Sequence, residues 1–425
     1  MNSSKASVLP GVFVLIVAVC VTSPPAFAKP GDLIRLLPNP FPGVADDFGV
    51  SIAVAGNNVL VGAYWDDAVV DRAGAAYVLD GSTGNLLQAF QNPASAEGDM
   101  FGWSVSFVGN NVVVGAKWDD TGASKAGAAY VFSGATGQLL LKIPNPTPEH
   151  YDCFGYSVAG VGNNVLVGAL HDNTAASNSG AAYLFDGTTG QLLQTFLKPA
   201  PSSFGMFGSS VAAFGNNVLV GALGHDTSSV NDAGAVYLFD GSTGELLRTF
   251  NNPNPDWSDR FGCSVAAVGN KVLVGANYDS PDGIEWAGAA YLFDASTGEL
   301  LHTFTSPNPN VSDFFGTSVA AVGDDVLIGA YWADVDGVAD VGAAFLFDGN
   351  TGELLATFVS PTPKAHSRFG CSVGGIGDDV LVGAMYDSQG APSSGAVYMF
   401  EGIPEPATLS LLALGGLVLV RRRRK

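Results

Sequence analysis

The stretch FGCSVAAVGNKVLVGA, residues 261–276, decides the fold, because the chain contains seven versions of it. Each version is followed by a loop, by a second apolar stretch such as GAAYLFDASTGELLHTF at 288–304, and by a loop rich in Asn and Pro. The Phe-Gly pairs that open the units lie 53 or 54 residues apart and begin at Phe48, Phe101, Phe154, Phe207, Phe261, Phe315 and Phe369. A period of this length indicates a solenoid or a propeller built from one repeated unit.

Within one unit, the apolar runs and turn residues predict four short strands. In the fifth unit these are residues 264–268, 272–276, 289–293 and 300–304. Gly269-Asn270 favours a tight hairpin between the first two, since Gly and Asn adopt positive φ most easily. Four antiparallel strands repeated seven times predict an all-β fold, a seven-bladed β-propeller. An open β-solenoid or a string of separate domains is the alternative, but so short a unit cannot bury both faces of its sheet alone.

The two ends of the repeat region complement each other. The seventh unit stops at Gly402 after three strands, without the segment that supplies the fourth strand elsewhere. The missing segment lies near the N-terminus, where residues 31–37 (GDLIRLL) align with residues 244–250 (GELLRTF). We therefore expect residues 33–37 to form the outer strand of the last blade, beside residues 396–400. Such a strand joins the two ends of the chain and covers two sheet edges.

Residues 1–28 have the three parts of a secretory signal peptide. Lys5 provides the positive start, residues 8–21 the apolar stretch, and Ala26-Phe27-Ala28 the cleavage site with small residues. An N-terminal membrane anchor is the alternative, although the apolar run is short and contains Pro10. The sequence predicts export across the inner membrane.

Residues 403–425 contain Pro404-Glu405-Pro406, an apolar run and the basic end RRRRK at 421–425. A helix over residues 407–420 would be about 21 Å long, which is short for a hydrocarbon core of about 30 Å, and the basic end prefers the cytoplasmic side. The three parts resemble the PEP-CTERM sorting signal of Gram-negative bacteria. The resemblance implies transient anchoring, an exosortase-type protease, cleavage near Pro404-Glu405-Pro406 and release to the cell surface or extracellular matrix. An ordinary C-terminal tail anchor is the alternative.

The composition is acidic and sparsely charged. The chain has 18 Lys and Arg against 39 Asp and Glu, a formal charge of −21, and only 13% of its residues are charged. Such a protein is repelled by nucleic-acid phosphates and by anionic lipid surfaces. An exported protein of this composition is expected to have glycans, envelope proteins or cations as its neighbours, and no nucleic-acid partner.

The repeat region, residues 29–402, resembles the FG-GAP repeats that form the propellers of integrin α-chains and of many bacterial surface proteins. The resemblance is carried by the Phe-Gly pair, by Val-Gly-Ala as at 61–63, and by Gly-Ala-x-Tyr-Leu-Phe. It implies adhesion or ligand binding on the upper face of the propeller, with Ca²⁺ in the first hairpin of some blades. The chain departs from the family there, because its hairpins shrink to turns such as Gly56-Asn57-Asn58. Since Ca²⁺ takes about six to eight oxygen ligands, we expect these calcium sites to be missing and no cofactor to be needed.

A pattern of aromatic and acidic residues marks the loops after the second strands. These loops and those after the fourth strands share one face of the ring, the upper face, and they are long enough to carry a binding site. Two interpretations stay open: the acids cap their own loops through backbone hydrogen bonds while the rings wedge between blades, or both contact a sugar. The residues are Trp65-Asp66, Trp118-Asp119, His171-Asp172, His225-Asp226, Tyr278-Asp279, Trp332 with Asp334, and Tyr386-Asp387.

One loop departs from the repeat in a way that suggests a cation site. Asp334, Asp336 and Asp340 place carboxylates at intervals along it. The loop lacks the terminal Glu and the spacing of a full calcium loop. Because a binding site usually breaks the symmetry of a repeat, these three residues are the candidate metal ligands.

Motifs of enzymes are scarce. The five His residues lack zinc spacing, and there is no nucleophile elbow. Residues 291–298 (YLFDASTG) resemble the repeat of quinoprotein dehydrogenases, but Thr303 and Phe304 replace the Trp by which those blades dock. The sequence predicts a non-enzymatic binding or adhesion module of the cell envelope or exopolysaccharide matrix. The alternatives are a structural matrix protein without a discrete ligand and, third, a hydrolase or quinoprotein on the same scaffold.

Overall fold

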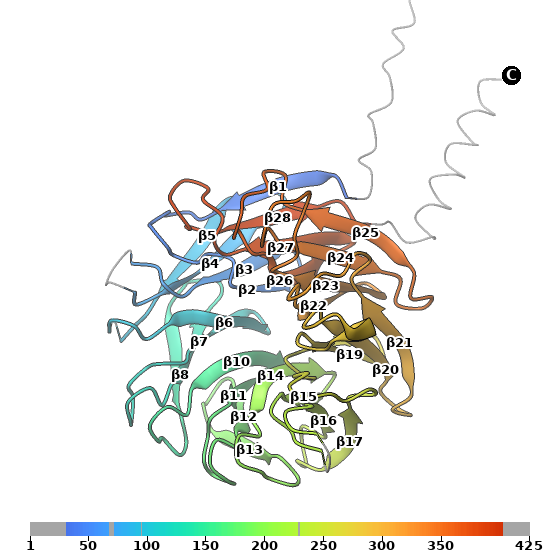
Figure 1. Ribbon diagram of the computed structural model, residues 1–425. Coiled ribbons are helices and arrows are strands. Elements are labelled where there is room, and N and C mark those ends of the chain that lie inside the picture. The colour runs from blue at the N-terminus through green and yellow to red at the C-terminus, as the bar shows by residue number, and fades with distance from the viewer. Residues whose placement is uncertain (1–30, 68–71, 95, 228–229, 403–425) are drawn as a thin grey trace, which may run out of the picture.

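The computed structural model of the chain describes residues 31–67, 72–94, 96–227 and 230–402. These residues form seven four-stranded antiparallel sheets, arranged as blades around a central axis (Figure 1). Six sheets contain four consecutive strands of the chain, and the seventh combines the last three strands with the first. The seven-bladed β-propeller predicted from the repeat is confirmed.

The strands are short and correspond from blade to blade. From blade 1 to blade 7, the first strands are β2 (Ser51–Ala55), β6 (Phe101–Val108), β10 (Phe154–Val161), β14 (Phe207–Phe214), β18 (Ser264–Val268), β22 (Phe315–Val322) and β26 (Phe369–Ile376). The second strands are β3 (Asn58–Ala63), β7 (Asn111–Ala116), β11 (Asn164–Ala169), β15 (Asn217–Ala222), β19 (Lys271–Ala276), β23 (Asp325–Ala330) and β27 (Asp379–Ala384). The third strands are β4 (Ala75–Asp80), β8 (Ala128–Ser133), β12 (Ala181–Asp186), β16 (Ala235–Phe239), β20 (Ala289–Asp294), β24 (Ala343–Phe347) and β28 (Ala396–Phe400). The fourth strands are β5 (Leu86–Gln91), β9 (Leu139–Pro144), β13 (Leu192–Leu197), β17 (Leu246–Asn251), β21 (Leu300–Thr305), β25 (Leu354–Val359) and β1 (Leu33–Pro38).

The connections between strands are short on the lower face and longer on the upper face. A two-residue turn such as Gly56-Asn57 joins the first and second strands of each blade, and Gly56 has a φ of 58°. So short a turn does not fit the calcium loops that the family resemblance implies at this hairpin, because it supplies too few oxygen ligands. The loop between β19 and β20 contains the one 3-10 turn in the described part of the chain, η1 (Pro281–Gly283).

Neighbouring blades are held together by residues of the repeat motif. The Ser of Phe-Gly-x-Ser donates a hydrogen bond to the carbonyl oxygen of the Phe-Gly glycine in the next blade, as Ser157 does to Gly208 at 2.8 Å. A Cβ on Gly168 of the Val-Gly-Ala motif would lie 2.1 Å from the same oxygen, so only glycine allows the sheets to approach this closely. This hydrogen bond occurs between all seven pairs of neighbouring blades.

The core lies between the sheets, and each of its clusters contains residues from two consecutive blades. In the cluster between blades 1 and 2, Leu60 and Phe90 pack with Phe101, Val112 and Tyr130. The Phe of each Phe-Gly pair is fully buried there, as Phe101 is. Since one blade offers only half of a cluster, the apolar burial that stabilises the fold depends on the ring being complete.

The first strand closes the ring. β1 pairs antiparallel with β28, with Leu37 opposite Val397, so the predicted position of the N-terminal strand is confirmed. Arg35 in β1 also donates hydrogen bonds to the backbone carbonyl oxygens of Ser82 at 2.5 Å and Thr83 at 3.0 Å, both in blade 1. β1 therefore completes blade 7 and fastens it to blade 1.

The two terminal signals lie outside the described residues. These are the predicted signal peptide, residues 1–28 with Ala26 and Ala28, and the sorting segment, residues 403–425 with Pro404, Glu405 and Pro406. In the described ranges, no helix is long and apolar enough to cross a membrane.

Candidate functional site

The predicted rings lie on the upper-face loops that follow the second strands, and most are half-buried. Several of them carry a protein cation over one face. The Arg72 guanidinium carbon lies 4.6 Å from the ring centroid of Trp65, and that of Arg368 lies 4.5 Å from the centroid of Tyr386. In such a contact the negative potential of the ring face attracts the cation, so one face of each of these two rings is covered by an arginine of the protein. The half-buried rings are Trp65, Trp118, His171, Tyr278, Trp332 and Tyr386.

Five of the acids beside these rings are buried and bonded within their own blade. Each is at most 4% exposed and accepts a hydrogen bond from a Tyr hydroxyl on the third strand. In blade 3, Tyr183 donates to Asp172 at 2.7 Å, and the backbone N–H of Thr174 donates to the same carboxylate at 2.7 Å. These acids thus fix the loop to the sheet. The pairs are Asp66–Tyr77, Asp119–Tyr130, Asp172–Tyr183, Asp279–Tyr291 and Asp387–Tyr398.

Blades 4 and 6 depart from this arrangement. The carbonyl oxygen of Asp66 accepts the backbone N–H of Gly74 in blade 1, and His225 and Ala333 make the same backbone bond in blades 4 and 6. His225 therefore occupies the place of the buried acid rather than that of the ring, which corrects the alignment drawn from the sequence. Asp226 and Asp334 lie one residue further along, where both are exposed.

The third-strand partner is kept in one of these two exceptions and lost in the other. The hydroxyl oxygen of Tyr237 lies 3.4 Å from Nδ1 of His225 in blade 4. Burial, with a smaller effect of Lys198, lowers the pKa of His225, which favours the neutral ring. In blade 6, where Ala333 provides no polar partner, the Tyr of the third strand is replaced by Phe345. The acid and the hydroxyl are thus lost together in blade 6, whereas blade 4 loses the acid and keeps the hydroxyl of Tyr237.

A second set of buried acids lies two residues before the Phe of the Phe-Gly pair. In four blades an Asn amide of the preceding loop donates to the acid, as Asn39 does to Asp46 at 2.7 Å. Burial raises the pKa of these acids to about 6, and that of Asp259 to about 7. The aromatic pattern did not indicate them, although an Asn followed by an Asp seven residues later is visible in the repeat. They are Asp46, Asp99, Asp152, Asp259 and Asp313.

The residue immediately before each Phe-Gly pair adopts a left-handed backbone conformation in all seven blades. For a residue other than glycine this conformation is strained and is common near functional sites. The side chains here vary freely, although the motifs on either side hardly change. They are Asp47, Met100, Cys153, Met206, Arg260, Phe314 and Arg368, with φ between 49° and 58°.

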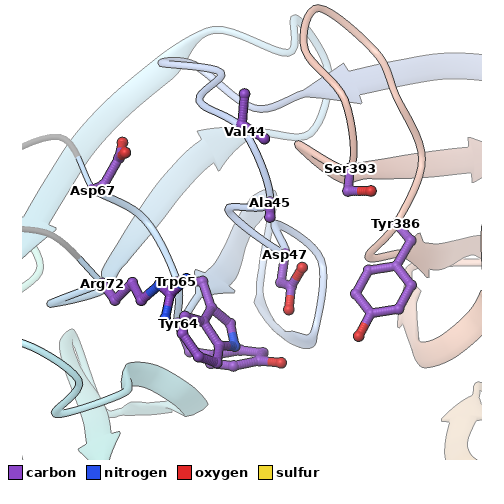
Figure 2. Close-up of a pocket in the computed structure, with 9 residues that line it drawn as sticks. All are labelled: Val44, Ala45, Asp47, Tyr64, Trp65, Asp67, Arg72, Tyr386 and Ser393. Atoms are coloured by element: carbon purple, nitrogen blue, oxygen red, sulfur yellow. The ribbon is translucent and has the colours of Figure 1, made fainter.

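A pocket of about 620 Å³ lies on the upper face between blades 7 and 1 (Figure 2). Tyr64 and Trp65 lie together on one side of it, 5.6 Å apart between ring centroids, and Tyr386 lies across from them. Three segments form it: the loop from β1 to β2, the loop after β3 and the loop after β27. The lining residues are Val44, Ala45, Asp47, Tyr64, Trp65, Asp67, Arg72, Tyr386 and Ser393.

Asp47 is the buried acid of this pocket. Its side chain is 3% exposed, and burial raises its pKa to about 7, against the opposing effects of a hydrogen bond with Tyr64 and of the Arg368 charge. In the other six blades the same position holds no acid. The buried acid of the pocket therefore occupies a position at which the side chain varies from blade to blade.

The axis of the ring carries a buried lysine that the sequence pattern did not indicate. A cavity of about 250 Å³ runs along the first strands, and Trp103 and Tyr156 line it. Lys117 Nζ lies 2.8 Å from the ring centroid of Trp103 and 5.3 Å from that of Tyr156. Burial lowers the pKa of Lys117 to about 7. In blades 2 and 3 the aromatic side chains at the axis are thus occupied by a cation of the protein itself.

Two of the three carboxylates of the predicted cation loop are bonded to other groups of the protein. Asp334 accepts the backbone N–H of Asp340 at 3.0 Å, and a carboxylate oxygen of Asp340 lies 2.7 Å from Nδ1 of His366. Asp336 is exposed. Among the residues that the structure describes, no group of three or more His, Cys, Asp or Glu side chains is placed to hold a metal ion.

Two family models match the chain. The model described as FG-GAP repeat matches residues 43–79, 94–132, 147–185, 201–239, 254–293, 301–347 and 355–400. The model described as the PEP-CTERM protein-sorting motif matches residues 402–425. No curated protein matches the chain. The first set of matches corresponds to the seven blades, and the second to the C-terminal segment with the Pro-Glu-Pro motif.

Proposed function

Because the chain belongs to the FG-GAP repeat family and ends in a PEP-CTERM protein-sorting motif, we propose that it is an exported binding or adhesion module. The sorting motif implies processing by an exosortase and sorting to the bacterial cell surface. In our proposal, residues 1–28 are removed as a signal peptide and residues 403–425 anchor the chain transiently. The propeller then works in the envelope or exopolysaccharide matrix of a Gram-negative bacterium, without catalysis.

The pocket between blades 7 and 1 carries this proposal. Its volume of about 620 Å³ is in the range of small-ligand sites. It combines the rings of Tyr64, Trp65 and Tyr386 with the polar groups of Asp47 and Asp67. Aromatic faces stack on the apolar faces of sugars, and carboxylates accept hydrogen bonds from sugar hydroxyls. The combination favours a glycan as the ligand.

The experiment measures binding of polysaccharide fragments to the mature exported protein by calorimetric titration. Trp65→Ala removes a ring of the pocket and is expected to weaken binding roughly tenfold or more. The matched control is Trp118→Ala, because Trp118 has the same repeat position in blade 2 but does not line the pocket. We expect the control to bind like the unmodified protein.

Three other outcomes would contradict the proposal. Equal losses in Trp65→Ala and Trp118→Ala would assign binding to the whole ring rather than to the pocket. No saturable binding of any fragment or envelope protein would favour a structural matrix protein without a discrete ligand. Turnover of a fragment, or the absorbance of a bound quinone, would favour an enzyme.

A further inference from the structure

The acids of the closing pocket are more numerous than its cations. Asp47 and Asp67 line it, and Arg72 is the one basic residue among its lining residues. Two more acids, Asp46 and Asp66, lie close to the pocket. Asp46 is near enough to Asp66 and Asp67 for their charges to raise its pKa. Four acids thus lie in or close to the pocket, against the two guanidinium groups of Arg72 and Arg368.

Among the residues that the structure describes, one carboxylate oxygen beside the pocket has no hydrogen-bond partner. Asp46 is fully buried, and its Oδ2 accepts hydrogen bonds from Asn39 at 2.7 Å and from the backbone N–H of Gly43 at 2.5 Å. Its Oδ1 accepts none from the described part of the chain. A Cβ on Gly43 would lie 2.6 Å from Asp46 Oδ1 and 3.0 Å from Asp67 Oδ1. Two carboxylate oxygens therefore converge beside Gly43. Burying such a group unpaired is costly, so the arrangement favours a positively charged donor.

The walls of the pocket already accept cations. The guanidinium groups of Arg72 and Arg368 lie over the rings of Trp65 and Tyr386. An aromatic ring attracts a cation through the negative potential of its face. A ligand that carries both a sugar ring and an ammonium group would match the rings and the carboxylates together.

Asp47 also distinguishes the contact between blades 7 and 1 from the other six contacts between neighbouring blades. Asp47 stands where the other six blades carry Met100, Cys153, Met206, Arg260, Phe314 and Arg368. Structural features of the propeller recur in blade after blade, as the Ser–Gly hydrogen bonds do. The fold does not require a buried acid at this position, so we take a ligand as a reason for Asp47 in addition to its hydrogen bond with Tyr64.

We propose that the pocket binds an amino sugar with a free ammonium group, such as a unit of a partly deacetylated hexosamine polymer. The inference rests on the proposed function, that the upper face binds a glycan. The ammonium group bonds to the carboxylates of Asp47 and Asp67, and the sugar ring lies against Tyr64, Trp65 and Tyr386. A lysine side chain of a peptide has the same charge but would leave much of a pocket of about 620 Å³ unfilled.

The test compares two probes that differ only in whether their amines are free or acetylated. The exported protein is titrated with glucosamine oligomers and with the same oligomers after complete N-acetylation. We expect the amine form to bind roughly tenfold or more tightly, because a charge-assisted hydrogen bond is lost on acetylation. A lysine-rich peptide and Ca²⁺ alone are the two further probes.

The variants remove charge at constant shape. Asp47→Asn retains a residue type that tolerates the left-handed conformation of position 47, so the backbone is preserved. In Asp47→Asn and Asp67→Asn we expect the amine and acetylated oligomers to bind with nearly equal Kd. The control is Asp120→Asn, since Asp120 has the position of Asp67 in blade 2 and lies outside the pocket. It should keep the full preference.

The outcomes separate this inference from the proposed function. Equal or tighter binding of the acetylated oligomers would overturn the amine inference and leave glycan binding intact. Absence of binding to either form would overturn the inference, and with no other glycan bound it would remove the proposed function as well. Saturable binding of Ca²⁺ alone, or of the peptide as tightly as the amine oligomer, at a site abolished by Asp67→Asn would assign the pocket to a metal or a protein and overturn the inference.

Discussion

The contact between blades 7 and 1 and the contact between blades 3 and 4 use the same motif residues but present different surfaces. Ser372 donates to Gly49 at 2.6 Å in the first, as Ser157 does to Gly208 at 2.8 Å in the second. The residue before Phe-Gly is Asp47 in one and Met206 in the other. The motif therefore fixes how blades dock, and the unconstrained residue beside it fixes what each contact offers to a ligand.

The two contacts also differ in how the chain reaches them. At the closing contact, residues near the N-terminus meet strands β26 to β28 from the C-terminal end. The hydrogen bonds between β1 and β28 join the two ends of the chain there. The pocket draws Tyr386 and Ser393 from one end of the chain and its other lining residues from the opposite end. Binding at this pocket would therefore stabilise the closed ring.

The largest expected effect comes from removing the strand that closes the ring. Deletion of residues 29–42 removes β1, its pairing with β28 and the two hydrogen bonds of Arg35. It also exposes the core shared by blades 7 and 1, to which Leu37 contributes. We expect loss of cooperative folding or a much lower Tm in circular dichroism.

Arg35→Ala is the control for this deletion, because it leaves the strand in place. It should cost only about 1 kcal/mol of unfolding free energy. A native-like Tm for the deletion would show that β1 is dispensable for closure.

The next prediction compares equivalent serines at the two contacts. Ser372→Ala and Ser157→Ala each remove the hydroxyl that donates to the glycine carbonyl of the next blade, at a cost of about 1–2 kcal/mol. Opening of the ring at β1 breaks the Ser372 bond but not the Ser157 bond. Hydrogen exchange of the β1 amides should therefore accelerate in Ser372→Ala and stay unchanged in Ser157→Ala. Equal exchange rates in the two variants would mean that opening does not begin at the closing contact.

The sequence predicted what the repeat determines and missed what depends on single residues. Seven blades and the pairing of β1 with β28 follow from aligned motifs, because each strand has six equivalents to compare with. The place of His225 was misjudged, since the loop of blade 4 contains Gly224 where the other blades have a ring. The pocket was missed because Asp47 belongs to no motif, and its importance depends on Tyr386, which is distant in sequence.

The third prediction concerns pH. Burial raises the pKa of Asp47 and Asp259 to about 7 and that of Asp46, Asp99, Asp152 and Asp313 to about 6, all above the ordinary 3.8. The folded state therefore holds these protons more tightly than the unfolded chain, so ionisation costs stability. The cost is complete above about pH 7 and is relieved as pH falls through the folded-state values towards about 4.

We accordingly expect a Tm several degrees higher near pH 5 than near pH 8, measured by calorimetry at constant ionic strength. Asp259→Asn should reduce the slope, because it removes one of the titrating groups. Asp226→Asn is the control, since Asp226 is exposed, and it should leave the slope unchanged. A Tm that is flat or falls on acidification would contradict the role of the buried acids.

The smallest expected effect tests the acid–hydroxyl pair that blade 6 lacks. Tyr183→Phe in blade 3 removes the donor to Asp172 and should cost about 1 kcal/mol. Phe345→Tyr in blade 6 adds a hydroxyl opposite Ala333, where no carboxylate accepts its hydrogen bond. Ala333→Asp adds a buried carboxylate opposite Phe345, which offers no donor. Each single substitution should therefore destabilise the folded protein. Together, the two substitutions rebuild the pair found in five other blades, so a double-mutant cycle should give a favourable coupling of about 1 kcal/mol. A coupling near zero would mean that the joint loss of acid and hydroxyl in blade 6 does not reflect their hydrogen bond.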